Sequence, residues 1–220
     1  MISKYSAVLF DFDGTLIDSS KGIFKSVLYA LESFGIKETD MTRLNYFIGP
    51  PLWDSFMHQY SVDSVTADKM VEKFREDYHT SGVHISEMYD GIPEILKLLK
   101  SNGIKVGIAS SKPFDFIKMI LKQYDIADYF DDLVGVDFNN KQADKKFIIQ
   151  NAVSALGLNM DDGILMVGDR HFDITGACEN TIDSVGVLYG FGTRQELEKA
   201  GATYIIEHIC ELEKIVFDKN

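Results

Sequence analysis

Six short apolar runs, rich in valine, isoleucine and leucine, constrain the fold of this chain more than any other feature. They are AVLF (7–10), KVGIAS (105–110), DLVGV (132–136), GILMVG (163–168), SVGV (184–187) and TYII (203–206). Their apolar residues are continuous rather than alternating, which is typical of strands buried on both faces. Helical patterns at 92–99, 117–124 and 148–156 separate them. The alternation predicts an α/β fold with a doubly wound, mainly parallel sheet and right-handed crossovers.

The segment 16–84 interrupts this alternation and contains no convincing strand pattern. Apolar residues recur at helical spacing over 23–34 and within 65–82. Gly49, Pro50 and Pro51 break the chain between these two patterns. We therefore expect an α/β core of residues 1–15 and 85–220, with residues 16–84 inserted as an α-helical cap.

Charge and composition narrow the classes of partner. The chain has 220 residues, is 45% hydrophobic and carries a formal net charge of -12, which argues against nucleic-acid and anionic-membrane partners. It has two cysteines, too few for a disulfide framework, and no apolar run long enough to span a bilayer. The first residues run into a strand without a signal-peptide pattern. We expect a cytoplasmic protein with reduced thiols, and a monomer.

Carboxylates, hydroxyls and lysines follow the predicted strands, where parallel sheets bind their ligands. Asp11 and Asp13 follow the first run and, two residues apart in an extended chain, point the same way. Other polar residues near strand ends are Ser110, Ser111, Lys112, Asp169 and Asp173, and the segment NNKQADKK supplies Lys141, Lys145 and Lys146. Two carboxylates held so close repel each other unless a cation lies between them.

This set of residues fits metal-assisted phosphoryl transfer. Mg²⁺ takes oxygen ligands, often one or two carboxylates together with substrate phosphate. An aspartate beside the metal can attack phosphorus, and a second carboxylate can move the protons. A hydroxyl and a lysine can hold the phosphoryl oxygens, which carry charge in the transition state.

The chain resembles the haloacid dehalogenase superfamily in four ordered places. These are DFDGTL near the start, Ser110 after the second core run, a lysine before a helix, and VGDRHFD at 167–173. With its helical segment after the first motif, the chain is most similar to the phosphoglycolate phosphatase-like branch. The resemblance covers essentially the whole chain and implies the same α/β core with a helical cap.

The resemblance implies a role for each acid. Asp11 corresponds to the nucleophile and to a metal ligand. Asp13 corresponds to the general acid and base, and its backbone carbonyl to a further metal ligand. Asp169 corresponds to the metal-binding acid, with Asp173 supporting the metal shell. The implied cofactor is Mg²⁺.

The resemblance also implies which residues bind the substrate. Ser110 corresponds to the phosphate-binding hydroxyl, and Ser111 and Thr15 are further candidates. In the cap, we expect the turn at Gly49 and Pro50 to face the active site and contact the substrate.

The lysine of the third motif has two candidates, because the proline pattern of many relatives is missing here. Lys145 matches best by its position at a helix start, where it would neutralise nucleophile and phosphate. Lys141 is the competing choice. A solvated helix charge is the simple structural interpretation of Lys145.

Several other candidates also have structural interpretations. Asp13 and Gly14 form a strong turn signal. Ser110 and Ser111 could cap the following helix, and Asp173 could be a favourable charge at a helix N-terminus. The ordered set of motifs favours the catalytic interpretation in each case.

We predict a Mg²⁺-dependent phosphatase that acts on a small phosphorylated metabolite through an aspartyl-phosphate. Asp13 favours this chemistry, because dehalogenases of the superfamily lack the second acid and ion-pumping ATPases have threonine there. Phosphoglycolate is the default substrate by resemblance, and a nucleoside monophosphate or pyrophosphate competes with it. A phosphomutase similar to β-phosphoglucomutase, or a non-catalytic protein on the same fold, are the alternatives of other classes.

Overall fold

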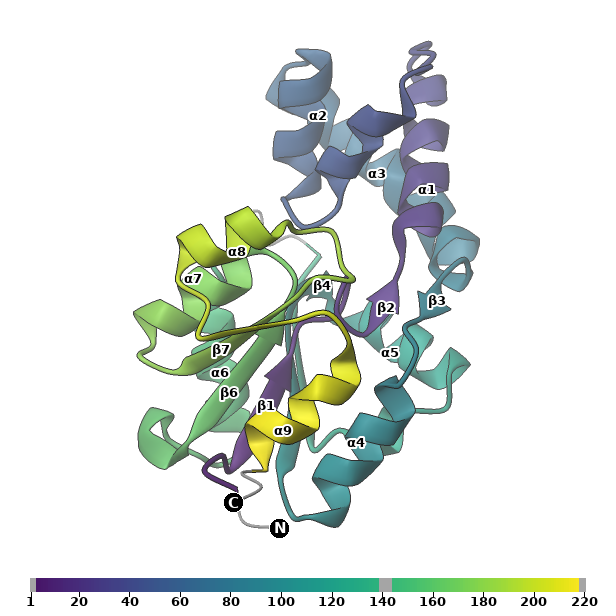
Figure 1. The fold of residues 1–220 in the computed structure, drawn as a ribbon. Helices are drawn as coiled ribbons and strands as arrows, with labels where there is room; N and C mark the ends of the chain where they lie inside the picture. Colours follow the sequence, from purple (N-terminus) through teal and green to yellow (C-terminus); the bar gives the residue numbers. More distant parts are fainter. Residues whose placement is uncertain (1–2, 139–143, 218–220) are drawn as a thin grey trace. The chain divides into compact units, whose positions relative to one another are not determined.

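A six-stranded parallel sheet forms the centre of the larger of two compact units (Figure 1). The computed structural model of the chain describes residues 3–138 and 144–217. The strand order is β5-β4-β1-β6-β7-β8, and every neighbouring pair is parallel. The strands are β1 (Ala7–Phe10), β4 (Lys105–Pro113), β5 (Asp132–Val136), β6 (Ile164–Gly168), β7 (Asp183–Val187) and β8 (Tyr204–Ile206). Each coincides with one of the apolar runs, so the predicted fold class is confirmed.

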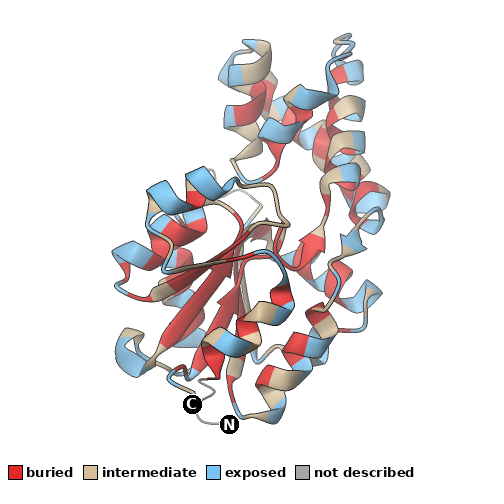
Figure 2. Cartoon of the chain, viewed as in Figure 1, coloured by how far each residue is buried: buried red, intermediate tan, exposed pale blue. Residues whose placement is uncertain are grey.

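Helices cover both faces of this sheet. They are α4 (Ile92–Ser101), α5 (Phe114–Gln123), α6 (Lys145–Ala155), α7 (His171–Glu179), α8 (Arg194–Ala200) and α9 (Leu212–Val216), with short 3₁₀ turns at Ala127–Tyr129, Met160–Asp162 and Ile209–Glu211. Apolar residues of α6 pack with Ala7 and Leu9 of β1. Val8 and Phe10, which alternate with them, face the other side and are fully buried, where α4 and α9 lie together (Figures 1 and 2).

The strand register brings the polar ends of three strands to one edge. Phe10, the last residue of β1, pairs with Ile108 of β4 on one side and with Val167 of β6 on the other. The residues that follow β1 and β6, and the end of β4, therefore lie next to one another.

The edge strands differ from the expectation of burial on both faces. Every residue of β5 is half-buried, and so are two of the three residues of β8. Both strands lie at the ends of the sheet, where they have a single neighbour. Continuous apolar sequence alone did not distinguish an edge strand from a central one.

The second compact unit, Asp18–Glu87, is mainly helical. It contains α1 (Ser20–Ser33), a 3₁₀ segment at Met41–Phe47, α2 (Leu52–Tyr60), α3 (Ser64–Thr80) and a 3₁₀ turn at Gly82–His84. Helix α1 packs against α3, and Gly22 of α1 lies so close to Gly82 that a Cβ atom would overlap the Gly82 carbonyl. Phe47 and Phe56 meet edge to face in its interior, with ring centroids 4.8 Å apart.

The expectation that 16–84 contains no strand was wrong. Ile17–Asp18 forms a short strand, β2, which pairs with β3 (Glu87–Met88). Two residues are too few to give an apolar pattern in the sequence. The helical unit accordingly begins and ends slightly later in the chain than the expected 16–84. Among the described residues, none of the helices has the length and apolar character needed to cross a bilayer.

Asn180, at the C-terminal end of α7, ties α7 to α6. Its side-chain amide donates to the carbonyl oxygens of Lys146 (3.0 Å) and Gly176 (2.8 Å), and its carbonyl accepts from Gln150 Nε2 at 2.9 Å. The side chain is nearly buried. Because α6 begins at Lys145 and α7 carries Asp173, this link fixes the relative position of two candidate site residues.

Replacing Asn180 with alanine should lower the free energy of unfolding by about 1–3 kcal/mol, because one buried and one partly buried carbonyl lose the amide as a donor. Urea unfolding followed by circular dichroism measures this. Asn151→Ala is the matched control, because Asn151 is exposed on α6, and it should leave stability nearly unchanged. Equal stability of the two variants would contradict the proposed link.

Candidate active site

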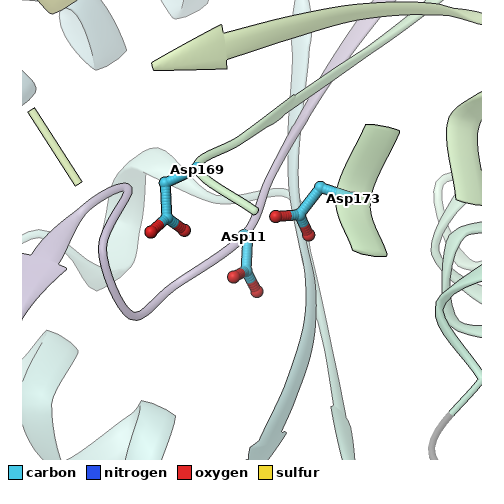
Figure 3. A group of neighbouring side chains, drawn as sticks. All are labelled: Asp11, Asp169 and Asp173. Carbon is cyan, nitrogen blue, oxygen red and sulfur yellow. The ribbon is translucent and has the colours of Figure 1, made fainter. Parts of the chain in front are cut away.

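Two acids follow adjacent strands and meet at the edge of the sheet. Asp11 comes directly after β1, and its backbone N–H donates to the Val167 carbonyl of β6 at 2.9 Å. Asp169 comes directly after β6. Both side chains are buried, and Figure 3 shows their carboxylates side by side. The parallel pairing of β1 and β6 thus brings together residues that lie far apart in the sequence.

Asp173 joins them from the first turn of α7. Oxygen atoms of Asp11, Asp169 and Asp173 lie within 4.8 Å of one another. Gly168 makes the approach possible, because a Cβ atom there would overlap the Asp173 side chain.

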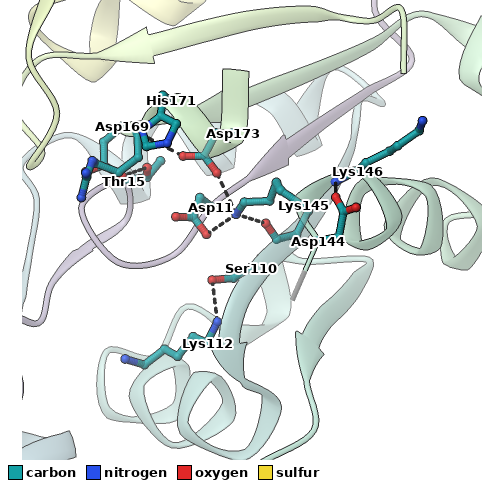
Figure 4. Close-up of polar contacts among 12 residues, drawn as sticks. Asp11, Thr15, Ser110, Lys112, Asp144, Lys145, Lys146, Asp169, His171 and Asp173 are labelled. Carbon is teal, nitrogen blue, oxygen red and sulfur yellow. Dashed lines mark hydrogen bonds and ion pairs between the residues drawn. The ribbon is translucent and has the colours of Figure 1, made fainter. Parts of the chain in front are cut away.

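Lys145 lies between two of these acids (Figure 4). Its Nζ is 2.8 Å from Asp11 Oδ1 and 2.7 Å from Asp173 Oδ1, and it donates to the Ala109 carbonyl at 2.9 Å. Burial works against the charged amine, but the charges of Asp11 and Asp173 raise the pKa of Lys145 above its usual value. A solvated helix charge is therefore excluded as the interpretation of this lysine.

Asp173 both caps its helix and faces the acids. Its Oδ2 accepts from the Arg170 backbone N–H at 3.1 Å, so the structural interpretation of this residue also holds. Its Oδ1 has an ion pair with Lys145 but no hydrogen-bond donor in suitable geometry among the described residues. Burial, together with the charge of Asp11, raises the pKa of Asp173 to about 6, although Lys145 opposes the shift.

Asp169 is fully buried, and no lysine among the described residues forms an ion pair with it. Burial raises the pKa of Asp169 well above its usual value, and the charges of Asp173 and Asp11 add to the effect. The Phe191 backbone N–H donates to Asp169 Oδ2 at 2.8 Å, and Thr15 Oγ1 lies 3.5 Å from Oδ1. Gly14, with φ of 82°, passes so close that a Cβ atom would overlap this carboxylate.

The three acids fit a hard divalent cation. The donor atoms are all carboxylate oxygens, which Mg²⁺ prefers. One lysine cannot neutralise three buried carboxylates, and Asp173 Oδ1 lacks a hydrogen-bond donor in the described part of the chain. Asp11, Asp169 and Asp173 are thus the side chains that could hold the metal.

Asp13 is paired with a different lysine. Lys112 Nζ lies 2.9 Å from Asp13 Oδ1 and 3.0 Å from Oδ2. The sequence placed Lys112 after the second strand but gave it no role. A signal was available, because Lys112 is two residues beyond Ser110 and shares its face in an extended strand.

The three hydroxyl candidates differ in their burial and contacts. Ser110 is buried in β4, and its Oγ accepts from the Lys112 backbone N–H at 3.2 Å (Figure 4). Neither Ser110 nor Ser111 caps the next helix, because α5 begins at Phe114 after Pro113. The structural interpretation of the two serines is therefore wrong. Ser111 is half-buried, and Thr15 is fully buried beside Asp169.

Three candidates lie outside the part of the α/β unit that the structure describes. Gly49 and Pro50 lie in the other unit, in the turn before α2, and their contact with substrate stays a prediction. Lys141 lies outside the described residues.

Glu196 on α8 is a residue that the sequence analysis missed. It accepts hydrogen bonds from Arg170 Nε (2.9 Å), the His171 backbone N–H (3.0 Å) and His171 Nδ1 (2.7 Å). Partial burial opposes ionisation, but these donors outweigh it and lower the pKa of Glu196 to about 2. Arg170 and His171 are thereby held beside Asp169, and no local sequence pattern connects them with a glutamate so far along the chain.

Comparison with known proteins agrees with this geometry. Residues 8–187 match the model of the haloacid dehalogenase-like hydrolase family. A 5'-nucleotidase of Pseudomonas aeruginosa is 35% identical over 97% of this chain and 96% of its own length. Pyrophosphatase PpaX of Bacillus cereus is 29% identical over 99% of both chains. The crystal structure of a "predicted phosphatase" from Clostridium acetobutylicum has a TM-score of 0.89 and 43% identity, covering 96% of this chain and 97% of that one.

These similarities confirm two expectations from the sequence, the resemblance to the superfamily and the assignment as a phosphatase. The family model spans the strands that carry Asp11, Ser110 and Asp169. The chain belongs to the haloacid dehalogenase-like hydrolase family.

Proposed function

We propose that this phosphatase hydrolyses small-molecule phosphate monoesters with Mg²⁺, through an aspartyl-phosphate on Asp11. The supporting observation is the setting of Asp11, whose carboxylate lies against Lys145 and within 4.8 Å of two further acids. A nucleophile for phosphorus needs such a cationic surrounding, because the attacking carboxylate and the phosphoryl group are both anionic.

The proposed reaction has two steps. In the first, a carboxylate oxygen of Asp11 bonds to phosphorus, the ester P–O bond breaks, and Asp13 in its acid form gives its proton to the leaving oxygen. In the second, Asp13 takes a proton from water, the resulting hydroxide bonds to phosphorus, and the P–O bond to Asp11 breaks. Inorganic phosphate leaves and Asp13 is again an acid.

Lys145 and Ser110 would bind the phosphoryl oxygens during both steps. Asp11, Asp169 and Asp173 would hold the cation, together with the Asp13 backbone carbonyl implied by the family resemblance. When bound, Mg²⁺ would balance the negative charge of the carboxylates and of the phosphoryl group.

The candidate substrates differ in the leaving group. The Pseudomonas aeruginosa relative favours a nucleoside 5'-monophosphate as the first compound to test. Phosphoglycolate, the default from the family resemblance, and pyrophosphate belong in the same screen. We propose that the helical unit, with Gly49 and Pro50, selects among them, and that the protein is a cytoplasmic monomer. A phosphomutase would isomerise a sugar phosphate instead of releasing phosphate.

The decisive experiment is a phosphate-release screen over nucleoside monophosphates, phosphoglycolate, pyrophosphate and sugar phosphates, with and without Mg²⁺. We expect release from at least one monoester only when Mg²⁺ is present. Isomerisation of a sugar phosphate without release would assign the mutase reaction instead. No turnover of any compound would contradict the proposal.

Asp11→Asn should lower kcat by more than about 10³-fold, because the amide cannot attack phosphorus. The fold should persist, since the change keeps the shape of the side chain and relieves repulsion with Asp169 and Asp173. Phosphate release and thermal unfolding measure the two effects. Activity near the wild-type level would show that Asp11 is not the nucleophile.

Lys145→Ala should lower kcat by about 10²–10³-fold, because the phosphoryl oxygens lose a charged donor. Lys146→Ala is the matched control, since the neighbouring side chain is half-exposed and should change activity little. Lys141→Ala tests the competing lysine. If Lys141→Ala were inactive and Lys145→Ala active, the assignment of the third motif would be wrong.

Removal of divalent ions with EDTA should abolish phosphate release, and added Mg²⁺ should restore it. Asp169→Asn should raise the Mg²⁺ concentration for half-maximal activity by about tenfold or more, because a carboxylate ligand is lost. Asp161→Asn, an exposed acid nearby in the sequence, should not change that concentration. Full activity in EDTA would contradict the metal requirement.

A further inference from the structure

The ion pair between Lys112 and Asp13 has no part in the function proposed so far. Lys112 Nζ contacts both carboxylate oxygens of Asp13, at 2.9 Å and 3.0 Å. The lysine side chain is 5% exposed and the aspartate side chain 18% exposed. An ion pair on the surface would be mobile and would contribute little to stability. A nearly buried lysine that contacts both carboxylate oxygens instead fixes the orientation of the carboxylate.

The course of β4 explains why this lysine reaches Asp13. Strand β1 ends at Phe10, opposite Ile108, whereas β4 continues to Pro113. At about 3.3 Å per residue, Lys112 lies roughly 13 Å beyond that last pair, alongside the loop that carries Asp13. The extension of β4 is therefore what brings Lys112 level with this loop.

Two features of β4 determine the direction of the Lys112 side chain. Ser110 and Lys112 are buried while Ser111 between them is half-buried, as expected for residues that alternate between the faces of a strand. The register against β5 also shifts between Ala109 and Pro113, and such irregularities commonly redirect side chains beside active sites. The same face of β4 thus carries the candidate phosphate-binding hydroxyl and this lysine.

The aromatic ring of Phe12 further limits the positions that the Lys112 ammonium group can take. Lys112 Nζ lies 5.8 Å from the centroid of this ring, and Phe12 is fully buried. The ammonium group therefore lies over a fully buried ring and in contact with the Asp13 carboxylate. Asp11 has a different partner, Lys145, so the two acids of the first motif have separate lysines.

We infer that Lys112 is a positioning residue for Asp13, holding the carboxylate where it exchanges a proton with the leaving oxygen and with the attacking water. The inference rests on the proposed function. Lys112 acts through Asp13 and does not bind the phosphoryl group. Loss of the lysine should therefore slow the proton-transfer steps and leave substrate binding almost unchanged.

The leaving group offers a specific readout of this role. An alkoxide leaves phosphorus only if it receives a proton, whereas p-nitrophenolate is stable as an anion and leaves without one. Hydrolysis of the aspartyl-phosphate requires a base for water with either substrate. A displaced Asp13 should therefore spare the first step with p-nitrophenyl phosphate and slow the second step with both.

The experiment compares wild type, Lys112→Met, Lys112→Arg and Lys100→Met on p-nitrophenyl phosphate and on an alkyl phosphate monoester that the screen identifies. Lys112→Met should lower kcat for the alkyl ester by about 10²-fold or more, with KM changed far less. With p-nitrophenyl phosphate it should give a rapid burst of about one nitrophenol per enzyme, followed by slow turnover. Lys112→Arg should recover part of kcat, since it restores a cation.

Lys100→Met is the matched control, because Lys100 pairs with Asp131 away from the site and its loss should not change either reaction. Thermal unfolding of all variants separates folding from catalysis. Asp13 is partly exposed, so water can solvate it when the cation is removed.

Three results would overturn the inference alone, each with an active wild type. Unchanged kcat for the alkyl ester would remove any role for Lys112. A raised KM with normal kcat would make it a substrate-binding residue. Equal loss on both substrates, with no burst and no recovery by arginine, would make it structural. A wild type that hydrolyses neither substrate would instead overturn the proposed function, and the inference with it.

Discussion

Charge balance around three buried carboxylates is the constraint on which the rest of this active site depends. Asp11, Asp169 and Asp173 lie within 4.8 Å of one another, and Lys145 is the cation that the described structure places among them. Ionised, the four groups carry two net negative charges, which a low-dielectric interior tolerates poorly. Burial, together with the neighbouring negative charges, raises the pKa values of Asp169 and Asp173. A divalent cation has the charge that would balance the negative excess.

The backbone is shaped to permit this crowding. Gly14 and Gly168 lie where a Cβ atom would overlap the side chains of Asp169 and Asp173 respectively. Gly176 of α7 lies against Lys145, where a Cβ atom would come within 3.0 Å of the lysine side chain. These glycines let strand ends and helix starts approach closely enough for acids and lysine to meet.

The sequence predicted the sheet and the meeting of Asp11 with Asp169 at its edge, because a continuous apolar run followed by Asp is a strong local signal. It missed what depends on tertiary position. Glu196 binds Arg170 and His171 from a helix far along the chain, and the half-buried edge strand β5 has the same apolar pattern as a central strand. Helix α7 was expected only as a possible helix start at Asp173, because its short, mixed sequence lacks a clear apolar face. Lys112 was visible, but its partner depends on how far β4 extends beyond β1.

Reaction and substrate are encoded in different ways in this chain. The acids and lysines proposed for the reaction lie in or just after strands β1, β4 and β6 and in the first turns of α6 and α7, so short motifs suffice to identify them. The residues expected to select the leaving group lie in the helical unit, on turns such as Gly49 and Pro50. The sequence of the helical unit reflects mainly the packing of its own interior. It contains no short motif comparable to those of the α/β unit. Relatives can therefore share the proposed aspartyl-phosphate chemistry and still differ in substrate, as the nucleotidase and pyrophosphatase names of two full-length relatives illustrate.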